Sequence, residues 1–445
     1  MNKFLELRNT YKEFIYEKYQ IVETQNSYEI VFYFNIPNLT TFEPKLIIEK
    51  TNLKNNNIDK QFLEYLVFNI GLVELISYVK CTCSPNIIIK CGYLSENQIN
   101  WFKKLYYNGL GEFLYRNNIN IEEKELFNIT TIEKKQTFNV EYNGIGNLIP
   151  VGGGKDSNVT LELLKKEDNT CFIINPKGAN IECANISGFK TLTVKRILDK
   201  KIIELNKKGF LNGHTPFSAI VAFTSFLCAY LSNKKYIILS NEDSANQSTV
   251  LGTNINHQYS KTYEFENDFN EYTKEYFNID IKYFSLLRPL TEFQIGMLFS
   301  KMEKYHKTFK SCNLGSKGET WEWCNNCSKC LFVYIILSPF LYKEKLINIF
   351  GSDLFENKTL LETFKELLGY KETKPWECVG TYEEVRYAVS LLIKKLEEQK
   401  LPYLLEYYKN NYPLFLEEKF ETKYNEKNNL NEHFEKIIKE AINNV

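Results

Sequence analysis

The stretch Gly152-Gly153-Gly154-Lys155-Asp156-Ser157 decides the fold of this 445-residue chain. It follows a short apolar run, Asn147–Val151, and precedes a helical pattern over Asn158–Lys166. Without side chains, the backbone N–H groups of such a loop can curl around phosphate oxygens, and the following helix directs its positive N-terminal end at them. Strand, loop and helix together predict a phosphate-binding loop, and a tight turn without a ligand is the alternative.

The segments after the loop continue the alternation of strands and helices. Thr170–Ile174 has a strand pattern, Thr215–Leu231 a helical one, and Tyr236–Ser240 reads as a strongly apolar strand. This alternation favours a doubly wound parallel sheet with right-handed crossovers. In such sheets ligands collect beyond the carboxyl ends of the strands, where both the glycine loop and the polar segment Asn241–Asn246 fall. We therefore expect these two segments to face one site.

Three parts are expected along the chain. Residues 1–138 are predicted to form an α+β domain, and residues 139–345 carry the α/β pattern around the glycine loop. Residues 346–445 are predicted to be helical, with Thr381–Gln399 and Asn431–Asn444 as the clearest helices.

The N-terminal part mixes both kinds of pattern. Strand-like runs such as Tyr28–Phe34 and Asn86–Cys91 alternate with helical ones such as Gln61–Tyr78 and Glu96–Tyr107. Its first residues, Met1–Tyr19, mix charges through their apolar positions, which excludes a secretory signal and favours an amphipathic helix.

Composition narrows the class of function. The 55 basic and 55 acidic side chains balance, so no net field attracts nucleic acid or an anionic membrane. The apolar stretches Phe217–Leu231 and Leu331–Tyr342 are too short to span a bilayer, so no membrane segment is predicted. We expect a cytoplasmic protein, in which the 11 cysteines are reduced thiols. The sequence does not indicate an oligomeric state.

One cysteine cluster has the spacing of metal ligands. Its C-x11-C-x2-C-x2-C pattern offers four thiolates, the number that a closed tetrahedral Zn²⁺ site requires. The first cysteine must fold back across a loop that contains Gly315 and Gly318. We predict a structural zinc site, with buried free thiols or redox chemistry as the alternatives, at Cys312, Cys324, Cys327 and Cys330.

Polar residues are dense in Ser240–Asn246 and again in Asn254–Lys261. A solvated loop is one interpretation, and the other is a pocket for substrate and Mg²⁺ in which Glu242 or Asp243 holds the metal ion. His257 and Lys261 are candidates for proton transfer, or for binding a carboxylate or phosphate. The candidate substrate-binding residues are Asn241, Ser244, Asn246, Asn256 and Arg288.

Two further polar residues have more than one interpretation. Arg288 suits a bidentate grip on a substrate carboxylate, although a buried structural pair with Glu292 is equally compatible with the sequence. His214 opens a predicted helix, where it either caps the helix or binds a ligand.

The order of residues in the loop resembles the S-G-G-x-D-S loop of the PP-loop ATP pyrophosphatases, which cleave ATP between its α and β phosphates to make adenylates. It lacks the spacing of a Walker A loop or of a dinucleotide fold. Gly152 stands where that family usually has serine, which removes one hydroxyl contact. A cysteine cluster similar to the one above occurs in the queuosine-precursor synthase branch of these enzymes. The resemblance implies ATP binding by Gly152, Gly153, Gly154, Lys155, Asp156 and Ser157.

A wider resemblance covers nearly the whole chain. It is similar to the UDP-N-acetylmuramoyl-L-alanyl-L-glutamate epimerase family, MurL. The stretches that carry this resemblance are Gly71–Tyr78, Gly109–Phe113, Pro150–Ser157, Ser240–Asn246, Asn256–Lys261 and Lys374–Gly380.

What this resemblance implies is an ATP- and Mg²⁺-dependent isomerase of peptidoglycan precursor biosynthesis. Its substrate would be a small molecule, a UDP-sugar-linked dipeptide, whose terminal L-glutamate becomes D-glutamate with release of AMP and pyrophosphate. An ionised carboxylate beside Cα resists a second negative charge, so adenylation would make the α-proton removable, through an enolate or an oxazolone. Glu242, His257, Lys261 and Cys378 are then the candidate proton-transfer residues, although Cys378 also suits a small buried core position.

Two other functions are compatible with the sequence. A PP-loop enzyme that modifies tRNA or a base would share the loop and the cysteines, but the balanced charge disfavours it. A non-catalytic ATP-sensing module would bind the nucleotide without turnover.

Overall fold

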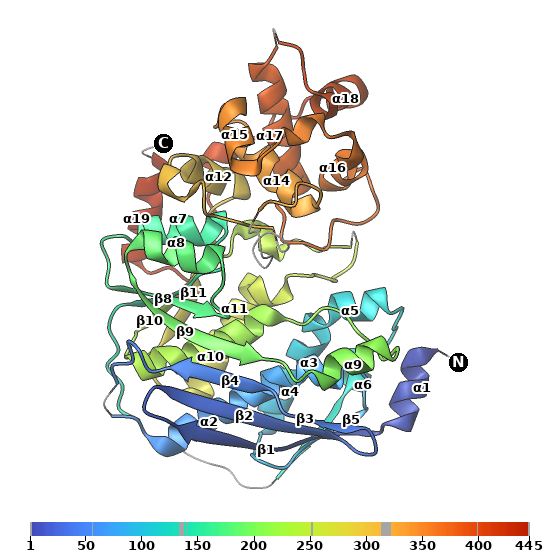
Figure 1. Cartoon of the computed structure of the whole chain (residues 1–445), viewed down its shortest axis with the longest axis vertical. Coiled ribbons are helices and arrows are strands. Elements are labelled where there is room, and N and C mark those ends of the chain that lie inside the picture. Colours follow the sequence, from blue (N-terminus) through green and yellow to red (C-terminus); the bar gives the residue numbers. More distant parts are fainter. Residues whose placement is uncertain are drawn as a thin grey trace. The chain divides into compact units, whose positions relative to one another are not determined.

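The computed structural model describes residues 2–55, 57–132, 138, 140–250, 252–312, 322–397 and 399–443, and Figure 1 shows its helices and strands. The chain divides into two compact units. Unit 1 consists of Met1–Leu148, Thr191–Ile237 and Gln258–Tyr283. Unit 2 consists of Ile149–Lys190, Ile238–His257 and Phe284–Val445. The three-part division expected from the sequence stays a prediction.

Unit 1 contains a mixed sheet with the strand order β9-β4-β2-β1-β5-β6, in which β3 also pairs with β2. Several of these strands lie side by side in Figure 1. Their bounds are β1 (Glu13–Glu23), β2 (Ser27–Ile36), β3 (Thr40–Phe42), β4 (Lys45–Glu49), β5 (Asn86–Ile89), β6 (Asn128–Thr131) and β9 (Lys190–Ile197).

The strands of unit 1 pair mostly in the antiparallel direction, whereas the parallel sheet was expected for the strands around the glycine loop. β1–β2, β2–β3, β2–β4 and β4–β9 are antiparallel, whereas β1–β5 and β5–β6 are parallel. The turn between β1 and β2 is closed by Thr24, whose N–H donates to Ser27 O at 2.9 Å. Such a short connection permits only antiparallel pairing, because a parallel pair needs a long crossover.

The N-terminus differs from the single helix predicted over Met1–Tyr19. Helix α1 (Lys3–Thr10) ends at Thr10, and β1 begins at Glu13. In the run Phe14-Ile15-Tyr16 all three side chains are buried. Branched and aromatic residues suit a strand that pairs on both sides, and this tertiary pairing overrides the helical pattern.

The helices of unit 1 include one long apolar stretch. Lys60–Val79, which comprises α2 and α3, is long and apolar enough to cross a membrane by length and composition. The two stretches considered from the sequence, Phe217–Leu231 and Leu331–Tyr342, are shorter. Of its most apolar window, 89% is buried inside the protein, as expected of a core helix. The helices are α2 (Lys60–Glu74), α3 (Ile76–Val79), α4 (Glu96–Gly109), α5 (Gly111–Arg116), α6 (Glu123–Leu126), α9 (Lys201–Lys207), α10 (Phe217–Ser232) and α11 (Tyr263–Tyr272).

Unit 2 contains the strands that follow and precede the glycine loop. Its strand order is β11-β10-β7-β8, and β7 and β10 run parallel. The strands β7 (Asn147–Pro150), β10 (Tyr236–Leu239) and β11 (Lys282–Ser285) begin in unit 1 and end in unit 2, whereas β8 (Asn169–Ile174) lies wholly in unit 2. The strands predicted at β7, β8 and β10 are confirmed.

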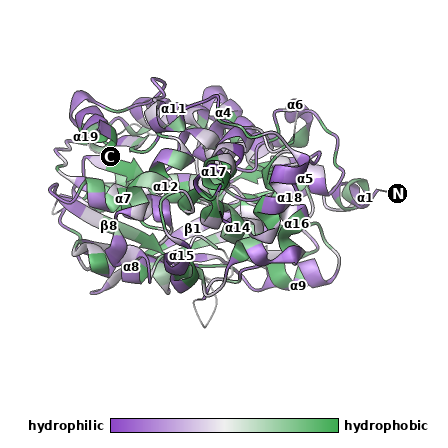
Figure 2. Cartoon of the chain, turned by 90° about the horizontal axis from the view of Figure 1, so that it is seen from above, coloured by the Kyte–Doolittle hydropathy of each residue, from purple (hydrophilic) through white to green (hydrophobic). Residues whose placement is uncertain are grey.

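The C-terminal part of unit 2 is helical, as predicted, and its helices are orange to red in Figure 1. All residues of α14 from Lys329 to Leu337 are buried, and its green colour in Figure 2 reflects this apolar sequence. The helices of unit 2 are α7 (Lys155–Leu163), α8 (Ala179–Ser187), α12 (Glu292–Ser300), α14 (Ser328–Leu337), α15 (Lys343–Phe350), α16 (Leu361–Leu367), α17 (Tyr382–Lys395), α18 (Tyr403–Asn411) and α19 (Glu432–Asn443). Asn444, in the predicted last helix, lies outside the described residues.

The fold is therefore mixed α/β, with a large sheet and a helical C-terminal part. The more specific PP-loop architecture stays a prediction.

The buried ion pair of Arg196 and Glu74 provides a test of the packing of unit 1. Arg196 donates two hydrogen bonds to the buried carboxylate of Glu74, at 2.7 and 2.8 Å, and a third to Ser77 at 2.8 Å. Glu74→Gln leaves the guanidinium largely buried without a counter-charge and is expected to destabilise the protein by about 3 kcal/mol. Urea unfolding measures this change. The exposed pair of Lys3 and Glu6 is the control, since Lys3→Gln should change stability by less than about 0.5 kcal/mol; equal effects would contradict the analysis.

Candidate active site in unit 2

The glycine loop joins β7 to α7 and ends at Gly154, the N-cap residue of the helix. Gly153 has φ of +82°, and a Cβ atom there would lie 2.6 Å from the backbone of Ala179. At Gly152 a Cβ atom would meet nothing within 4 Å. The middle glycine is therefore required by the fold, whereas the first faces open space, where the serine usual in PP-loop enzymes would also fit.

The loop is held by the segment before the cysteine cluster. The N–H of Lys310 donates to Gly153 O at 2.9 Å, and the N–H of Lys155 donates to Ser311 Oγ at 3.4 Å. Ser157 Oγ donates to Gly154 O at 3.1 Å. These bonds fix the loop at the N-terminus of α7, where helix N–H groups favour an anion.

Three carboxylates meet beside this loop. Asp156, Glu242 and Glu292 each offer an oxygen, and these oxygens lie within 4.8 Å of one another. Glu242 and Glu292 are 4% and 1% exposed, whereas the Asp156 side chain is 25% exposed. We name these residues the carboxylate trio. Carboxylate oxygens at this spacing are the ligands that Mg²⁺ prefers.

The ammonium of Lys155 neutralises part of the trio. It pairs with Asp156 Oδ1 and Glu292 Oε2, and its side chain is 2% exposed. Burial would lower the pKa of Lys155, but the two carboxylates raise it above its ordinary value. Burial also raises the pKa of Glu292, Lys155 lowers it, and Asp156 and Glu242 raise it again. Lys155 is therefore an ammonium, and the trio favours a further positive charge.

Glu292 is positioned by the start of α12. Thr291 caps this helix and forms a capping box with Gln294. The N–H of Glu292 donates to Glu384 Oε1 at 2.6 Å, and Glu384 belongs to the capping box of α17 with Thr381. Two helix N-termini thus meet at Glu384 and hold Glu292 toward the glycine loop. From the sequence, Glu292 was expected only as a partner for Arg288. The T-x-x-Q pattern at Thr291 is the signal that could have placed it at a helix start.

Glu242 is held from two sides. Arg288, which is fully buried, donates from Nη1 to Glu242 O at 2.9 Å. Ser244 Oγ donates to Glu242 Oε1 at 3.2 Å. Of the two acids proposed for Mg²⁺, Glu242 belongs to the trio, whereas Asp243 Oδ1 accepts from Asn425 Nδ2 at 2.5 Å.

The other predicted substrate residues of this segment lie along the same loop. Asn241 O accepts from Ser285 Oγ at 2.6 Å, and Asn246 Nδ2 donates to Asp243 O at 3.0 Å. Asn256 Nδ2 donates to Ala245 O at 2.9 Å. Asn246 and Asn256 therefore brace the turn in which Glu242 lies, and their roles toward a substrate stay predictions.

The candidates for proton transfer are divided between the units. His257 lies in unit 2, where its ring meets that of Trp376 edge-on with centroids 6.5 Å apart. Cys378 also lies in unit 2 and is half-buried. Lys261 belongs to unit 1, in the short 3₁₀ turn Tyr259–Lys261.

His214 does not cap a helix, contrary to one of its interpretations. Helix α10 begins at Phe217 with Pro216 as its N-cap residue. The Nδ1 atom of His214 instead lies 3.4 Å from Glu112 Oε2.

The four cysteines of the predicted metal site come together in unit 2. Four Sγ–Sγ distances, from Cys312 to Cys324 and Cys327 and from Cys330 to Cys324 and Cys327, are 3.4–3.6 Å. Thiolates about 2.3 Å from a tetrahedral ion lie about 3.8 Å apart, so this arrangement is nearly that of a zinc site. Gly315 and Gly318 lie outside the described residues.

The thiols also resist ionisation on their own. Hydrogen bonding with Cys312 raises the pKa of Cys327 to about 12 and raises that of Cys330 further. Four thiolates at these distances need a cation to neutralise them. The donor set therefore fits a closed metal site, which has no open position for catalysis.

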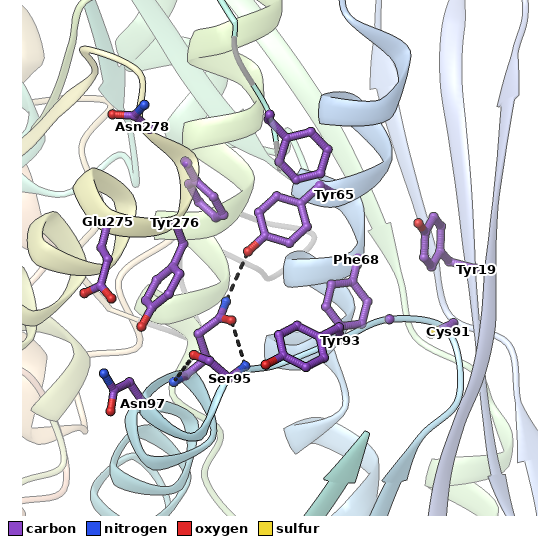
Figure 3. A pocket seen from close by; sticks show the side chains of 14 residues that line it. Tyr19, Tyr65, Phe68, Cys91, Tyr93, Ser95, Asn97, Glu275, Tyr276 and Asn278 are labelled. Atoms are coloured by element: carbon purple, nitrogen blue, oxygen red, sulfur yellow. Dashed lines mark hydrogen bonds between the residues drawn. The ribbon is translucent and has the colours of Figure 1, made fainter. Parts of the chain in front are cut away.

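Unit 1 contains a separate cavity of about 440 Å³, shown in Figure 3. Tyr65 and Phe138 stack at its wall with centroids 4.7 Å apart. The Gln98 amide is fixed, because Oε1 accepts from Ser95 N at 3.1 Å and Nε2 donates to Tyr65 Oη at 3.1 Å. Among the lining residues that the structure describes, Glu275 is the one charged side chain. Such a lining suits an uncharged planar group better than a phosphate.

Two family models match the chain. The MurL N-terminal domain matches residues 6–286, and the MurL C-terminal domain matches residues 308–421. No solved structure matches the chain.

Three curated relatives carry the name UDP-N-acetyl-alpha-D-muramoyl-L-alanyl-L-glutamate epimerase. The relative from Xanthomonas oryzae pv. oryzae is 34% identical over 74% of both chains. The one from Salinispora tropica is 35% identical over 73% of this chain and 72% of its own. The one from a Micromonospora species is 33% identical over 75% of this chain and 76% of its own.

The name shared by these relatives shows that the chain is an enzyme of the epimerase class. The chain belongs to the MurL family, and the resemblance inferred from the sequence is confirmed.

The glycine loop provides a direct test. Gly153→Ala is expected to destabilise the protein by about 2 kcal/mol or more, because its backbone lies in the left-handed region and the new Cβ would overlap backbone atoms. Gly152→Ala is the matched control and should change stability by no more than about 1 kcal/mol. Denaturant unfolding compares the two variants. A Gly153→Ala variant as stable as its control would overturn this geometry.

Proposed function

We propose that the protein converts the terminal L-glutamate of UDP-N-acetylmuramoyl-L-alanyl-L-glutamate to D-glutamate, in peptidoglycan precursor biosynthesis in the cytoplasm. ATP is consumed in this proposal through adenylation of the glutamyl carboxylate, with release of AMP and pyrophosphate. The name shared by the curated relatives supports the substrate. The observation that carries the chemistry is the carboxylate trio at the start of the glycine-loop helix.

The glycine loop fits the phosphates of ATP. Gly153 has the conformation that only glycine adopts readily, and Gly152 leaves open space in front of the loop. The N–H groups of the first turn of α7 would bind phosphate oxygens, as anions at helix N-termini are bound. Gly152, Gly153, Gly154 and Ser157 form this cradle in the proposal.

The trio fits Mg²⁺, which would neutralise the phosphates and polarise the group under attack. Asp156, Glu242 and Glu292 would be its ligands. Because Lys155 pairs with Asp156 and Glu292, this proposal requires its ammonium to turn from the carboxylates toward the phosphates when the nucleotide binds. Lys155 would then balance the charge of the site in both states.

Adenylation makes the epimerisation chemically accessible. The activated carbonyl can accept the electron pair of the broken Cα–H bond, which an ionised carboxylate resists. Donors at the site stabilise the oxyanion that results. Hydrolysis of the adenylate sets the direction of the reaction, because two epimers alone would settle near equal populations.

The assay uses the purified protein with the UDP-linked L,L-dipeptide, ATP and Mg²⁺, followed by chiral analysis of the glutamate and identification of the nucleotide product. We expect D-glutamate and AMP. ADP would overturn the adenylation, and AMP without D-glutamate would favour a base-modifying or other adenylating enzyme.

Substitution within the trio separates a catalytic from a structural role. Asp156→Asn should lower AMP and D-glutamate formation by about 100-fold or more, because it removes one carboxylate from the metal and phosphate site. Asp243→Asn is the matched control, since Asp243 pairs with Asn425 outside the trio. Equal activities of the two variants would contradict the assignment.

We also propose that the four cysteines hold a structural Zn²⁺ ion. Elemental analysis of the purified protein is expected to find zinc, and Cys327→Ser should lose most of it because three thiolates bind more weakly than four. Cys91→Ser, in unit 1, is the control and should retain the metal. Metal-free wild-type protein would refute this site.

A further inference from the structure

Lys374 is a buried lysine for which the sequence predicted no role. It begins the stretch Lys374–Gly380, and it is 5% exposed in unit 2. Thr373 forms an isolated bridge with Val250, and the N–H of Lys374 donates to Thr249 O at 3.2 Å. The backbone at Lys374 is therefore fixed against the segment that follows Glu242.

The side chain of Lys374 has few partners for an ammonium group. Its Nζ donates to Gln247 Oε1 at 2.8 Å and lies 5.7 Å from the centre of the Tyr382 ring. In the described part of the chain, no carboxylate forms an ion pair with it. Lys155, which is also buried, forms ion pairs with two carboxylates. An ammonium has three donors, so most of the hydrogen-bonding capacity of Lys374 is left for a ligand.

The charges around Lys374 come from three elements. Burial lowers the pKa of Lys374 to about 8, and four carboxylates oppose this shift. They are Glu384 and Glu383 on α17, Glu242 after β10, and Glu292 at the start of α12. An ordinary lysine is less than about 1% neutral at pH 8, whereas Lys374 has a substantial neutral fraction there.

We propose that the side-chain amine of Lys374 is the base that removes the α-proton of the activated glutamyl residue. This inference rests on the proposed function, because the α-proton is accessible to a base only after the carboxylate is activated. Gln247, which accepts from Lys374 Nζ at 2.8 Å, ends the turn that holds Glu242. Its N–H donates to Ser244 O at 3.1 Å, and Ser244 Oγ donates to Glu242 Oε1, a carboxylate oxygen of the trio, at 3.2 Å. In this proposal a glutamyl residue activated at the trio lies within reach of Lys374.

The step conserves atoms and electrons. The Nζ lone pair forms an N–H bond while the Cα–H bond breaks, and the released electron pair moves into the adjacent carbonyl to give an enolate. A second donor then protonates the opposite face of Cα, which restores the carbonyl in the D configuration. That donor regains its proton from water, and the Lys374 ammonium loses one to water. His257 and Cys378 in the same unit are the candidates for the second donor.

Experiments in deuterium oxide distinguish two roles of Lys374, that of a base and that of a positive charge that only binds the substrate. Wild-type protein should incorporate deuterium at Cα of glutamate and release AMP. Lys374→Met should lower deuterium incorporation and D-glutamate by about 10²–10⁴-fold, while AMP is still formed as the L-glutamyl adenylate hydrolyses. Lys374→Arg should behave like Lys374→Met, because arginine keeps the charge but does not act as a base.

If Lys374→Met forms no AMP, its loss of exchange does not test the base. Rescue of a Lys374→Ala variant by an added amine then provides the test. Methylamine added to Lys374→Ala should restore deuterium incorporation, and Lys371→Met, an exposed neighbour paired with Glu362, should match wild type. Normal exchange in Lys374→Met, activity restored by arginine, or no rescue by methylamine would each overturn the proposal. Wild-type protein that forms neither AMP nor D-glutamate would instead refute the proposed function.

Discussion

The ammonium of Lys155 keeps the candidate active site of unit 2 together, because it pairs with two of three carboxylates that would otherwise repel one another. Two of these carboxylates are almost completely removed from water, and buried charges are stable only when they are paired. Asp156 and Lys155 begin α7, Glu292 begins α12, and Glu242 follows β10. The pairing thus ties the glycine loop to the two segments that complete the site.

The helical C-terminal part of unit 2 also contacts Lys155 and the residues that hold Glu292. Helix α14 begins at Ser328 with Cys327, a member of the thiol cluster, as its N-cap residue, and the centre of its Phe332 ring lies 5.9 Å from the Lys155 ammonium. Lys329 donates to the carbonyl of Cys378, and a Cβ atom at Gly380 would lie 3.0 Å from both Phe332 and Glu384. An ion bound by the cysteines would therefore fix the N-terminus of α14, the helix that carries Phe332 next to Lys155. A closed metal site would thus stabilise the active site without taking part in the reaction.

Local patterns allowed the glycine loop, its strand and its helix to be predicted, because all three are adjacent in the sequence. The cysteine spacing similarly identified four thiols that the structure brings together. Glu292 and Lys374 could not be assigned, because long-range contacts place them: Glu292 reaches Lys155 from the start of α12, and Lys374 is bonded to Thr249 and Gln247, which are distant in the sequence. The antiparallel pairing of β4 with β9 and the strand at Glu13–Glu23 were missed for the same reason, since long-range pairing overrides local periodicity.

The most direct test of the account follows the oxygen atoms of the substrate. The UDP-linked L,L-dipeptide, labelled with heavy oxygen in the α-carboxylate of its glutamate, is incubated with the protein, ATP and Mg²⁺, and the nucleotide products are analysed by mass spectrometry. Adenylation followed by attack of water on the carbonyl carbon predicts AMP that carries one heavy oxygen atom from the substrate. Unlabelled AMP, or label in inorganic phosphate with ADP as the product, would contradict activation of the glutamyl carboxylate at the glycine loop.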